Sequence, residues 1–297
     1  MLKSVKESVS STYFNRGTWA FWGIHLTAII GVAVLGFSWA GLIWAGSLYV
    51  TRMFLVTAGY HRYFSHRSYK MSRPAQFVLA LLTQTSLQRG VLWWASRHRH
   101  HHRASDTDTD LHSPKRQGFW WSHVGWFLSP KYNATDYDSI KDFAKYPELR
   151  LLDDHPHLPG VALAAILLLV GGLPALVWGF FVSSVLLWHG TFTINSLSHM
   201  IGRKRFDNAD ESRNSLALAL VTLGEGWHNN HHYYQSSTNQ GFYWWQIDVT
   251  HLVLRVVAKT GLIWGLRRPP KRVLELGRRR GEDVIATDLL PTAPAET

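Results

Sequence analysis

The sequence has no cysteine among its 297 residues, which excludes disulfide bonds, thiolate metal ligands and cysteine nucleophiles. Acidic residues are also scarce, with 20 Asp and Glu against 31 Lys and Arg, and the formal net charge is +11. Such an excess suits nucleic acid, anionic lipid or a phosphorylated substrate. The sequence contains no helix-turn-helix, zinc-finger or RNA-recognition signature, so we expect no nucleic-acid partner.

Two long stretches, residues 17–51 and 155–202, contain no charged residue at all. A transmembrane helix needs about 20 apolar residues, so each stretch can hold most of a helical hairpin. The first hairpin is predicted to rise over residues 21–37, turn at 38–41 and return over 42–60, and the second to rise over 161–171, turn at 172–174 and return over 177–197. A buried helical core in a soluble protein is the less favoured alternative.

The expected fold is an all-α, multi-pass integral membrane protein with four transmembrane helices in two hairpins. Basic residues concentrate in the tail at residues 1–16, in segment 61–154 and in the C-terminal third. The positive-inside rule therefore places both termini and the middle segment in the cytoplasm, which means the inner membrane if the source is bacterial. Residues 1–16 lack an apolar core and do not resemble a cleaved signal peptide.

The resulting division has three parts. Residues 1–16 form a cytoplasmic tail, residues 17–270 form the main domain, and residues 271–297 form a basic helix with a disordered tail from about residue 287. Within the main domain the membrane hairpins span about 17–60 and 158–198, and the cytoplasmic segments span 61–157 and 199–270. Segment 73–94 is apolar but interrupted by polar residues, so we expect one helix at the membrane interface there.

Nine of the seventeen histidines gather in short motifs at the ends of the apolar stretches. The motifs are HRYFSH from residue 61, HRHHH from residue 98, in which His100 is not counted among the nine, and HNNHH from residue 228, with a single histidine at 199. Imidazole is the commonest metal ligand among side chains and suits iron, zinc and copper. Because one zinc site needs only three or four ligands, nine histidines indicate two metal ions.

The spacing within the motifs has a geometric meaning on a helix. Successive residues are about 100° apart, so His101 and His102 diverge and can face two different ions, while His98 joins one of them. In the motif that starts at His228, His231 and His232 diverge in the same way and can face two different ions, while His228 joins one of them. Asn195 lies one helical turn before the histidine at 199 and shares its face. His61 and His66, five residues apart, are a poor same-face pair unless the helix ends between them.

These motifs, together with TDTDLHSPKRQGFWWSHVGW and GEGWHNNHH, resemble the membrane acyl-CoA desaturases, the stearoyl-CoA 9-desaturase family, from about residue 17 to 270. The resemblance implies four transmembrane helices below a cytoplasmic helical dome that holds a non-haem di-iron site. It implies as direct ligands His61, His66, His98, His101, His102, His199, His228, His231 and His232, with Asn195 completing one shell through a water.

The resemblance also implies the reaction. The expected function is oxygen-dependent insertion of a cis double bond into a long-chain fatty acyl-CoA, at the 9 position. Since no fused haem domain is found, the resemblance implies a separate electron donor, either cytochrome b5-like or a ferredoxin with its reductase. A phospholipid-acyl desaturase, a membrane fatty-acid or alkane hydroxylase, and a non-enzymatic metal-binding membrane protein remain the alternatives.

Several other residues are expected to support the metal site. Glu225 lies three residues before a motif histidine, but soluble di-iron bundles need a second such pair, so we expect it behind the ligands. Asp106 and Asp110 imitate a calcium loop, yet Leu111 replaces its glycine and Gln117 its terminal glutamate. A better role for both aspartates is to accept the far N–H of metal-bound histidines.

Residues that contact the substrate are predicted from their residue type and their position in the sequence. Lys115 and Arg116 could pair with CoA phosphates, or with anionic lipid instead. Aromatic side chains expected along the acyl path are Trp93, Trp94, Trp188 and Trp227. His189 could line that path, form a polar contact between helices or be an ordinary core histidine. His100 should project away from the metal, while His112 and His123 are weaker candidates for the site.

Overall fold

The computed structural model describes residues 12–289, and the side chains of residues 12–280. After a short 3-10 turn, η1 (Arg16–Thr18), the apolar helix α2 (Trp19–Leu35) is followed by α3 (Trp39–Leu55), which continues as the π-helix η2 (Val56–Ser65). The reversal falls at residues 36–38, where Gly36 has a φ of 72°, slightly before the predicted turn at 38–41. Ser38 then caps α3 by accepting a hydrogen bond from the backbone N–H of Gly41.

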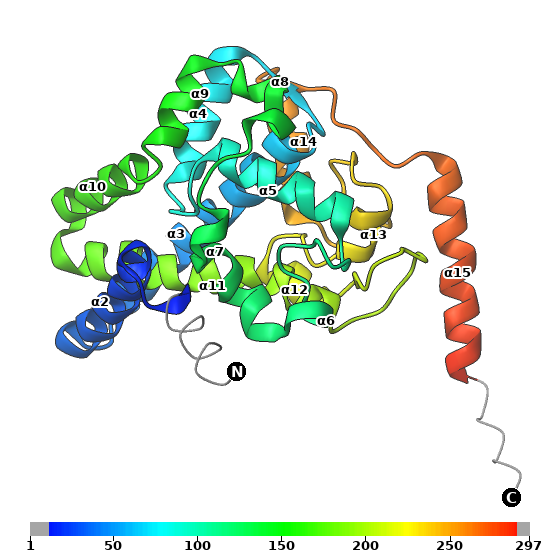
Figure 1. Cartoon of the computed structure of the whole chain (residues 1–297), viewed down its shortest axis with the longest axis horizontal. Coiled ribbons are helices and arrows are strands. Elements are labelled where there is room, and N and C mark those ends of the chain that lie inside the picture. The colour runs from blue at the N-terminus through cyan, green and yellow to red at the C-terminus, as the bar shows by residue number, and fades with distance from the viewer. Residues whose placement is uncertain (1–11, 290–297) are drawn as a thin grey trace, which may run out of the picture.

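A second apolar stretch comprises α10 (Leu158–Pro174), the π-helix η6 (Ala175–Val182) and α11 (Ser183–Asn195), followed by the 3-10 turn η7 (Leu197–His199). Gly172 interrupts it with a φ of 63°, at the predicted turn. Leu167 and Phe180 belong to one buried cluster, although an unbroken helix would separate them by about 20 Å. The chain therefore folds back at Gly172, and η6 packs against α10, α2 and α3 (Figure 1).

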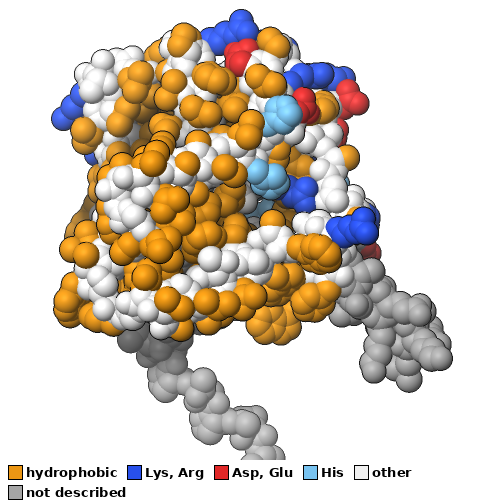
Figure 2. All heavy atoms as spheres, turned by 90° about the vertical axis from the view of Figure 1, so that its left-hand side faces the viewer, with side chains coloured by type: hydrophobic (Ala, Val, Ile, Leu, Met, Phe, Trp, Pro, Cys, Tyr) orange, Lys and Arg blue, Asp and Glu red, His pale blue; other side chains and the backbone are white. Residues whose placement is uncertain are grey.

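Three helices, Arg16–Leu35, Trp39–Ser65 and Leu158–His199, are long and apolar enough to cross a membrane. The last contains the break at Gly172, so the count of four crossings stays a prediction. Figure 2 shows the face over α2 and α10, which hydrophobic side chains cover while charged side chains gather toward its rim. Val34 is 77% exposed and Leu169 84% exposed. An apolar surface of this extent suits contact with lipid.

Arg52, near the end of α3, lies inside the protein at 1% exposure. Its guanidinium donates hydrogen bonds to the hydroxyls of Ser183 and Ser184 and to the carbonyl of Thr85. These contacts join α3 to α11 and to the loop at residues 85–90. Because the partners are neutral dipoles, they satisfy the N–H groups without a buried carboxylate.

The prediction of one helix over residues 73–94 is wrong. The segment forms α4 (Arg73–Gln84) and then α5 (Val91–Ala104), and Leu87 and Arg89 between them have positive φ. The restart at α5 depends partly on a residue far away in the sequence, because the Asp153 carboxylate accepts hydrogen bonds from the second and third backbone N–H groups of α5, at Leu92 and Trp93, while Gln84 accepts from the first, at Val91. Free N–H groups at a helix start need such acceptors, and the apolar pattern of 73–94 does not reveal them.

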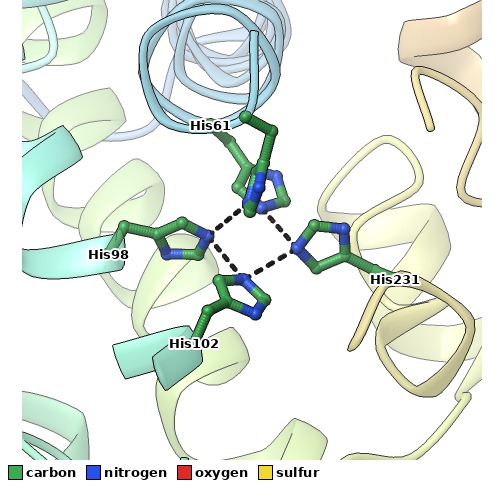
Figure 3. Close-up of side chains that lie close together, drawn as sticks. His61, His98, His102 and His231 are labelled. Atoms are coloured by element: carbon green, nitrogen blue, oxygen red, sulfur yellow. Dashed lines mark hydrogen bonds between the residues drawn. The ribbon is translucent and has the colours of Figure 1, made fainter. Parts of the chain in front are cut away.

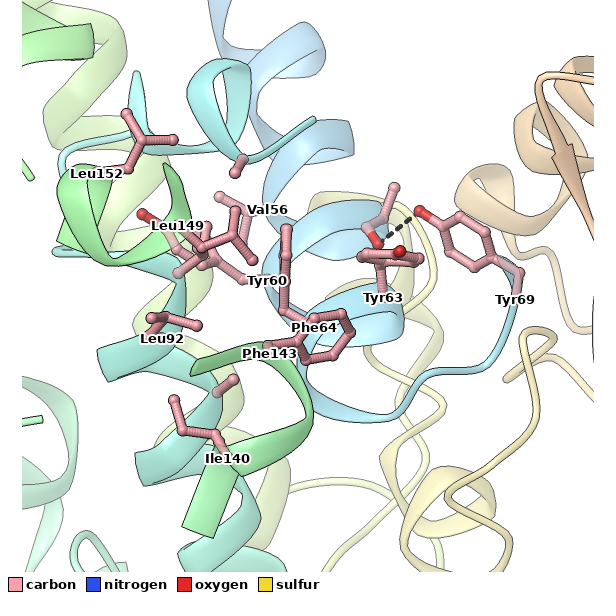
Figure 4. Close-up of a cluster of buried hydrophobic side chains, with 14 of the residues drawn as sticks. Val56, Tyr60, Tyr63, Phe64, Tyr69, Leu92, Ile140, Phe143, Leu149 and Leu152 are labelled. Atoms are coloured by element: carbon pink, nitrogen blue, oxygen red, sulfur yellow. Dashed lines mark hydrogen bonds between the residues drawn. The ribbon is translucent and has the colours of Figure 1, made fainter. Parts of the chain in front are cut away.

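The remaining elements form a dome of short helices beside the long ones. They are α6 (Pro114–Gln117), η3 (Trp121–Gly125), α7 (Trp126–Leu128), η4 (Pro130–Tyr132), η5 (Tyr137–Ile140), α8 (Lys141–Ala144), α9 (Pro147–Asp154), α12 (Leu216–Val221), α13 (His228–Tyr233) and α14 (Val249–Ala258). The core of the dome, drawn in Figure 4, packs Tyr60 and Phe64 of η2 against Leu92, Phe143 and Leu149. This core fixes η2 against α5, and these two helices carry two of the histidine motifs.

The C-terminal part begins with a two-stranded antiparallel pair, β1 (Lys70–Met71) with β2 (Ile263–Trp264), and ends with α15 (Lys271–Leu289). The basic helix is longer than predicted, since it continues past residue 287, where we expected disorder. Val273 anchors it in a cluster with Phe206 and Tyr243. The rest of the expected disordered tail, and residues 1–11 of the N-terminal tail, lie outside the described residues.

The topology can be tested by cysteine labelling, since the native chain has no cysteine. We expect Phe37→Cys and Leu173→Cys, at exposed positions beside the two reversals, to react with an impermeant thiol reagent added outside intact cells. Asp108→Cys, whose native side chain is 88% exposed in the dome, should react only after the membrane is opened. Labelling of Asp108→Cys from outside would overturn the predicted orientation.

Candidate metal centre

The nine motif histidines lie in two clusters. The first contains His61, His66, His98, His102 and His231, and the second contains His101, His199, His228 and His232. Within each cluster the possible ligand nitrogens lie within 4.8 Å of one another. Figure 3 shows rings of the first cluster converging from η2, α5 and α13.

Helix geometry distributes the histidines between the clusters. On α5, His98 and His102 face the first cluster, whereas His101 faces the second. On α13, His231 faces the first cluster, whereas His228 and His232 face the second. The predicted divergence of neighbouring histidines is therefore present in both motifs, because adjacent residues on a helix point about 100° apart.

The first motif uses a different local structure. Its π-helix η2 ends at Ser65, so the helix does end between His61 and His66, and the N–H of His66 bonds to the carbonyl of His61 at 3.2 Å. This i→i+5 bond, typical of π-helices, places residues five apart above each other. The two rings are 4.8 Å apart as a result. The sequence predicted the helix end but not the π-turn that brings both rings to one cluster.

The donor set fits a metal that accepts more than four ligands. Neighbouring Nε2 atoms of the first cluster are 2.8–3.0 Å apart, between His61 and His231, His66 and His98, and His98 and His102. Two nitrogens at right angles around a metal, each bonded at the length known for zinc, would lie about 3.0 Å apart. Five imidazoles exceed the tetrahedral set of zinc and suit an octahedral ion such as iron.

Burial keeps most of these rings neutral. Desolvation first, and then the neighbouring imidazoles, lower the pKa values of His98, His102, His228 and His231 well below the ordinary range. A neutral imidazole has a free lone pair, which is the form that binds metal. In the second cluster, the buried Nε2 atoms of His101 and His232 have no hydrogen-bond partner, as expected of lone pairs reserved for an ion.

Carboxylates lie behind the rings and fix their orientation. The Nδ1–H groups of His101, His199 and His232 donate to Asp110 at 2.9 Å, to Asp106 at 2.9 Å and to Asp210 at 2.6 Å. Protonation at Nδ1 leaves Nε2 free to point into the cluster. Burial alone would raise the pKa values of the three aspartates, but the histidine contacts and other hydrogen bonds lower them overall.

Glu225 lies behind the first cluster, in contact with Nδ1 of His61. Arg62 pairs with Glu225 at 2.9 Å and with Asp248 at 2.9 Å, and it is 1% exposed. Burial raises the pKa of Glu225, but His61 and Arg62 outweigh it and lower that pKa to about 2. Sequence reasoning missed Asp210, Asp248 and Arg62. For Arg62 a signal existed, since an arginine inside a histidine motif at a buried helix end needs a partner.

A cavity of about 350 Å³, lined by aromatic side chains together with polar and charged ones, opens beside the first cluster and lies within the size range of ligand pockets. Its lining includes His98, Asn195, Trp93, Trp94 and Trp188, all predicted near the site. Sequence reasoning missed other lining residues, namely Phe21, Gln88, Arg89, Arg97 and Phe192. In Figure 2 a hollow opens in the apolar face beside histidine side chains.

Four residues predicted to contact substrate do not line this cavity. Trp227 donates its indole N–H to the carbonyl of Ile247. Lys115 and Arg116 form surface ion pairs with Glu211 at 2.8 Å and Asp108 at 3.2 Å. The fourth residue, His189, is described next.

His189 forms a polar contact between helices. Its Nε2 lies 3.1 Å from Nε2 of His25 on α2, and its Nδ1 lies 2.9 Å from Nε2 of His123. His123 in turn contacts the hydroxyl of Ser196 at 3.0 Å. Of the three readings left open for His189, the geometry selects the contact between helices. These histidines support the cavity wall from behind, since His123 and His189 pack against Phe192.

The two other histidines of the central region differ in position. His100 lies at the dome surface, where Nε2 contacts the carbonyl of Thr109 at 3.0 Å, away from both clusters. His112 is buried, stacks on His101 at 4.2 Å between ring centroids and lines the cavity. Asn195 lines the same cavity as His98 and His112 and so lies at the boundary between cavity and metal clusters.

Comparison with known proteins agrees with this arrangement. Residues 37–265 match the family described as fatty acid desaturase. The chain is 38% identical over 212 residues to an sn-2 palmitoyl-lipid 9-desaturase of Nostoc sp., covering 70% of this chain and 74% of that protein. It is 36% identical over 256 residues to an sn-1 stearoyl-lipid 9-desaturase of Synechocystis sp., covering 86% and 80% respectively.

Another relative is named for an acyl-CoA substrate and for the 5 position, in contrast to the two lipid 9-desaturases. The chain is 36% identical over 227 residues to an acyl-CoA 5-desaturase of Anemone leveillei, covering 74% of this chain and 69% of that protein. Two histidine clusters beside an apolar cavity, apolar helices long enough for a membrane, and a family match over most of the sequence lead to one assignment. The chain belongs to the fatty acid desaturase family.

Proposed function

We propose that the protein uses O₂ to insert a cis double bond into a long-chain fatty acyl group, at a di-iron site formed by the two histidine clusters. One observation carries this proposal: His98 belongs to the first cluster and also lines the cavity, where Trp93, Trp188 and Phe192 provide apolar walls, so an alkyl chain held there would lie beside the metal. A purely metal-binding membrane protein has no need of such a cavity.

The proposed ligands are the nine clustered histidines, five for one iron and four for the other. Asn195 would complete the shell of one iron through a water. Asp106, Asp110, Asp210 and Glu225 hold the rings by their far nitrogens, as second partners of metal-bound histidines commonly do. Arg62 offsets the charge of Glu225 in a site that water does not reach.

Iron bound there would supply the activation of O₂ and the removal of hydrogen from an unactivated methylene, which no side chain can achieve. Desaturation takes two electrons from the substrate and two from an outside donor and reduces O₂ to two waters. The residues of the chain hold the alkyl group and keep water away. Trp93, Trp188 and Phe192 give the cavity apolar walls, and the histidine contacts behind Phe192 support one of those walls.

We further propose that α2, α3, α10 and the η6–α11 segment cross the membrane four times, with the dome and both termini in the cytoplasm. The apolar outer faces of these helices and the basic residues outside them support this orientation. An acyl chain could then enter the cavity from the lipid side, while its head group stays at the dome.

For the substrate form we propose a long-chain acyl-CoA, desaturated at the 9 position. Arg89 and Arg97 line the cavity beside the dome, and the Nε–H of Arg97 has no hydrogen-bond partner in the described part of the chain. Guanidinium groups suit phosphate. Lys115 and Arg116, paired with Glu211 and Asp108, could add weaker contacts from outside. Lipid-linked chains are the second candidate, because two relatives are named as lipid 9-desaturases.

The ligand assignment predicts a contrast between neighbouring histidines on α5. We expect His101→Ala to lower the iron content from two ions per chain toward one and to abolish desaturation, because one ligand of the second cluster is lost. His100→Ala, at the surface of the same helix, should keep both iron and activity. Iron analysis and product measurement on purified protein test this. Equal losses in the two variants would contradict the assignment.

The carboxylates behind the rings lead to a second prediction. We expect Asp210→Ala to leave the fold intact but to weaken iron retention by about 10- to 100-fold, the usual effect of losing such a partner. The matched control is Asp108→Ala, because the Asp108 side chain is 88% exposed and lies outside both clusters. The rate of iron transfer to a chelator measures the difference. Unchanged retention in Asp210→Ala would show that His232 does not depend on Asp210.

The substrate form can be separated kinetically. If Arg89 and Arg97 bind CoA phosphates, Arg89→Gln/Arg97→Gln should raise KM for acyl-CoA with little change in kcat, because the contact is remote from the reacting carbons. Each contact is worth about 1 kcal/mol or less, so the pair predicts roughly a tenfold effect. Lys115→Glu/Arg116→Glu should have a smaller effect. New double bonds found only in intact phospholipid after a short labelling pulse would instead select the lipid-linked substrate.

A further inference from the structure

A groove lies between the end of α13 and the first turns of α15. Tyr233 and Tyr234 line one side, and Arg272, Leu276 and Arg279 line the other. The groove is held in place, because the hydroxyl of Tyr243 donates to a carbonyl of α15 at 2.9 Å. In Figure 1, α13 and α15 lie at the opposite end of the molecule from α2 and α10, so this groove is far from the apolar face.

The α15 side of the groove is strongly basic. Residues 267–280 contain seven Lys and Arg and a single acidic residue, Glu275. Arg272, Arg278 and Arg279 are exposed, and none forms an ion pair with residues whose side chains the structure describes. Uncompensated cations on one face attract an acidic partner and speed its encounter.

The α13 side leads directly to both metal clusters. Within this one short helix, His231 belongs to the first cluster and His232 to the second. Tyr233 follows His232 in the chain, is 38% exposed, and stacks on Phe206 at 4.3 Å between ring centroids. Tyr233 is thus one residue away from a ligand of the second cluster and two residues away from a ligand of the first. Electron transfer slows steeply with distance, so this short covalent route suits the entry of electrons.

We propose that the groove is the docking site for an acidic, soluble one-electron carrier protein, with its redox group facing Tyr233. This inference rests on the proposed function: O₂, two carrier electrons, two protons and the saturated chain give the unsaturated chain and two waters. Each carrier brings one electron, so two must dock and leave in every turnover. A small, charge-steered contact fits that need better than a large apolar one.

The test measures how fast the iron-loaded enzyme oxidises a reduced plant-type ferredoxin, and separately the reduced haem domain of cytochrome b5. We expect Arg272→Glu/Arg279→Glu to slow the faster carrier by about tenfold or more at low salt. The difference should vanish as salt screens the charges. Arg272→Gln/Arg279→Gln should show a smaller loss. Lys141→Glu/Lys145→Glu, an equal charge change at exposed positions of the dome, should leave the rate unchanged.

A second measurement does not depend on iron. The oxidised carrier should bind metal-free enzyme, and Arg272→Glu/Arg279→Glu should lose that affinity while the Lys141 and Lys145 control keeps it. Unchanged carrier kinetics and binding in the groove variant overturn the proposal. So does a variant that loses only its binding to phosphatidylglycerol vesicles, since the patch would then be a lipid surface.

A third experiment distinguishes a failure of the docking proposal from a failure of the proposed desaturase function. In a single turnover of enzyme reduced chemically with dithionite, the wild type and the groove variant should form the same amount of unsaturated product. No product from the wild type would reject the desaturase proposal itself. Product from both proteins, with carrier oxidation unaffected by the substitutions, would reject the groove alone.

Discussion

The constraint on which the structure depends is the packing of nine imidazole rings, six of them buried and three partly buried, whose ring nitrogens face one another. In the first cluster Nε2 atoms lie only 2.8–3.0 Å apart, so neither water nor a shared proton can satisfy all of them. Such an arrangement can bind a metal ion only if the rings that serve as ligands are neutral and correctly oriented. Burial lowers the pKa values of His98, His102, His228 and His231, and carboxylates at Nδ1 orient His61, His101, His199 and His232. Four carboxylates of this basic chain, Asp106, Asp110, Asp210 and Glu225, provide these contacts.

The rest of the dome serves this arrangement. The π-turn at the end of η2 brings His61 and His66 together, and the core around Tyr60 and Phe64 presses η2 against α5. The start of α5 is fixed by Asp153, far along the chain, so the direction of its histidines depends on α9. The buried guanidinium of Arg62 forms ion pairs with both Glu225 and Asp248 and so holds these two carboxylates in place. Because every one of these contacts is buried, a small shift in one helix would be transmitted to several ligands.

Under the proposed function the molecule would separate its reactants in space. The apolar helices and the cavity would receive the acyl chain from the lipid side. The basic groove lies at the other end, beside α13, where a soluble protein can reach it. The clusters lie between the two surfaces, so the short helix α13 connects them to one side and His98 to the other. This division accounts for a chain that is apolar over long stretches and yet strongly basic overall.

The sequence by itself determined the apolar stretches, the histidine motifs and the division of His101 from His102, because helix period and hydrophobicity are local properties. It also indicated Asp106, Asp110 and Glu225, which stand near the motifs in the chain. Only the tertiary structure decided the roles of Asp210 and Arg62, the break between α4 and α5, and the residues that line the cavity. Tertiary packing also decided that Lys115, Trp227 and His189 lie outside the lining of the cavity. Which side chains meet across helices depends on how distant segments pack, and neither spacing nor residue type encodes that.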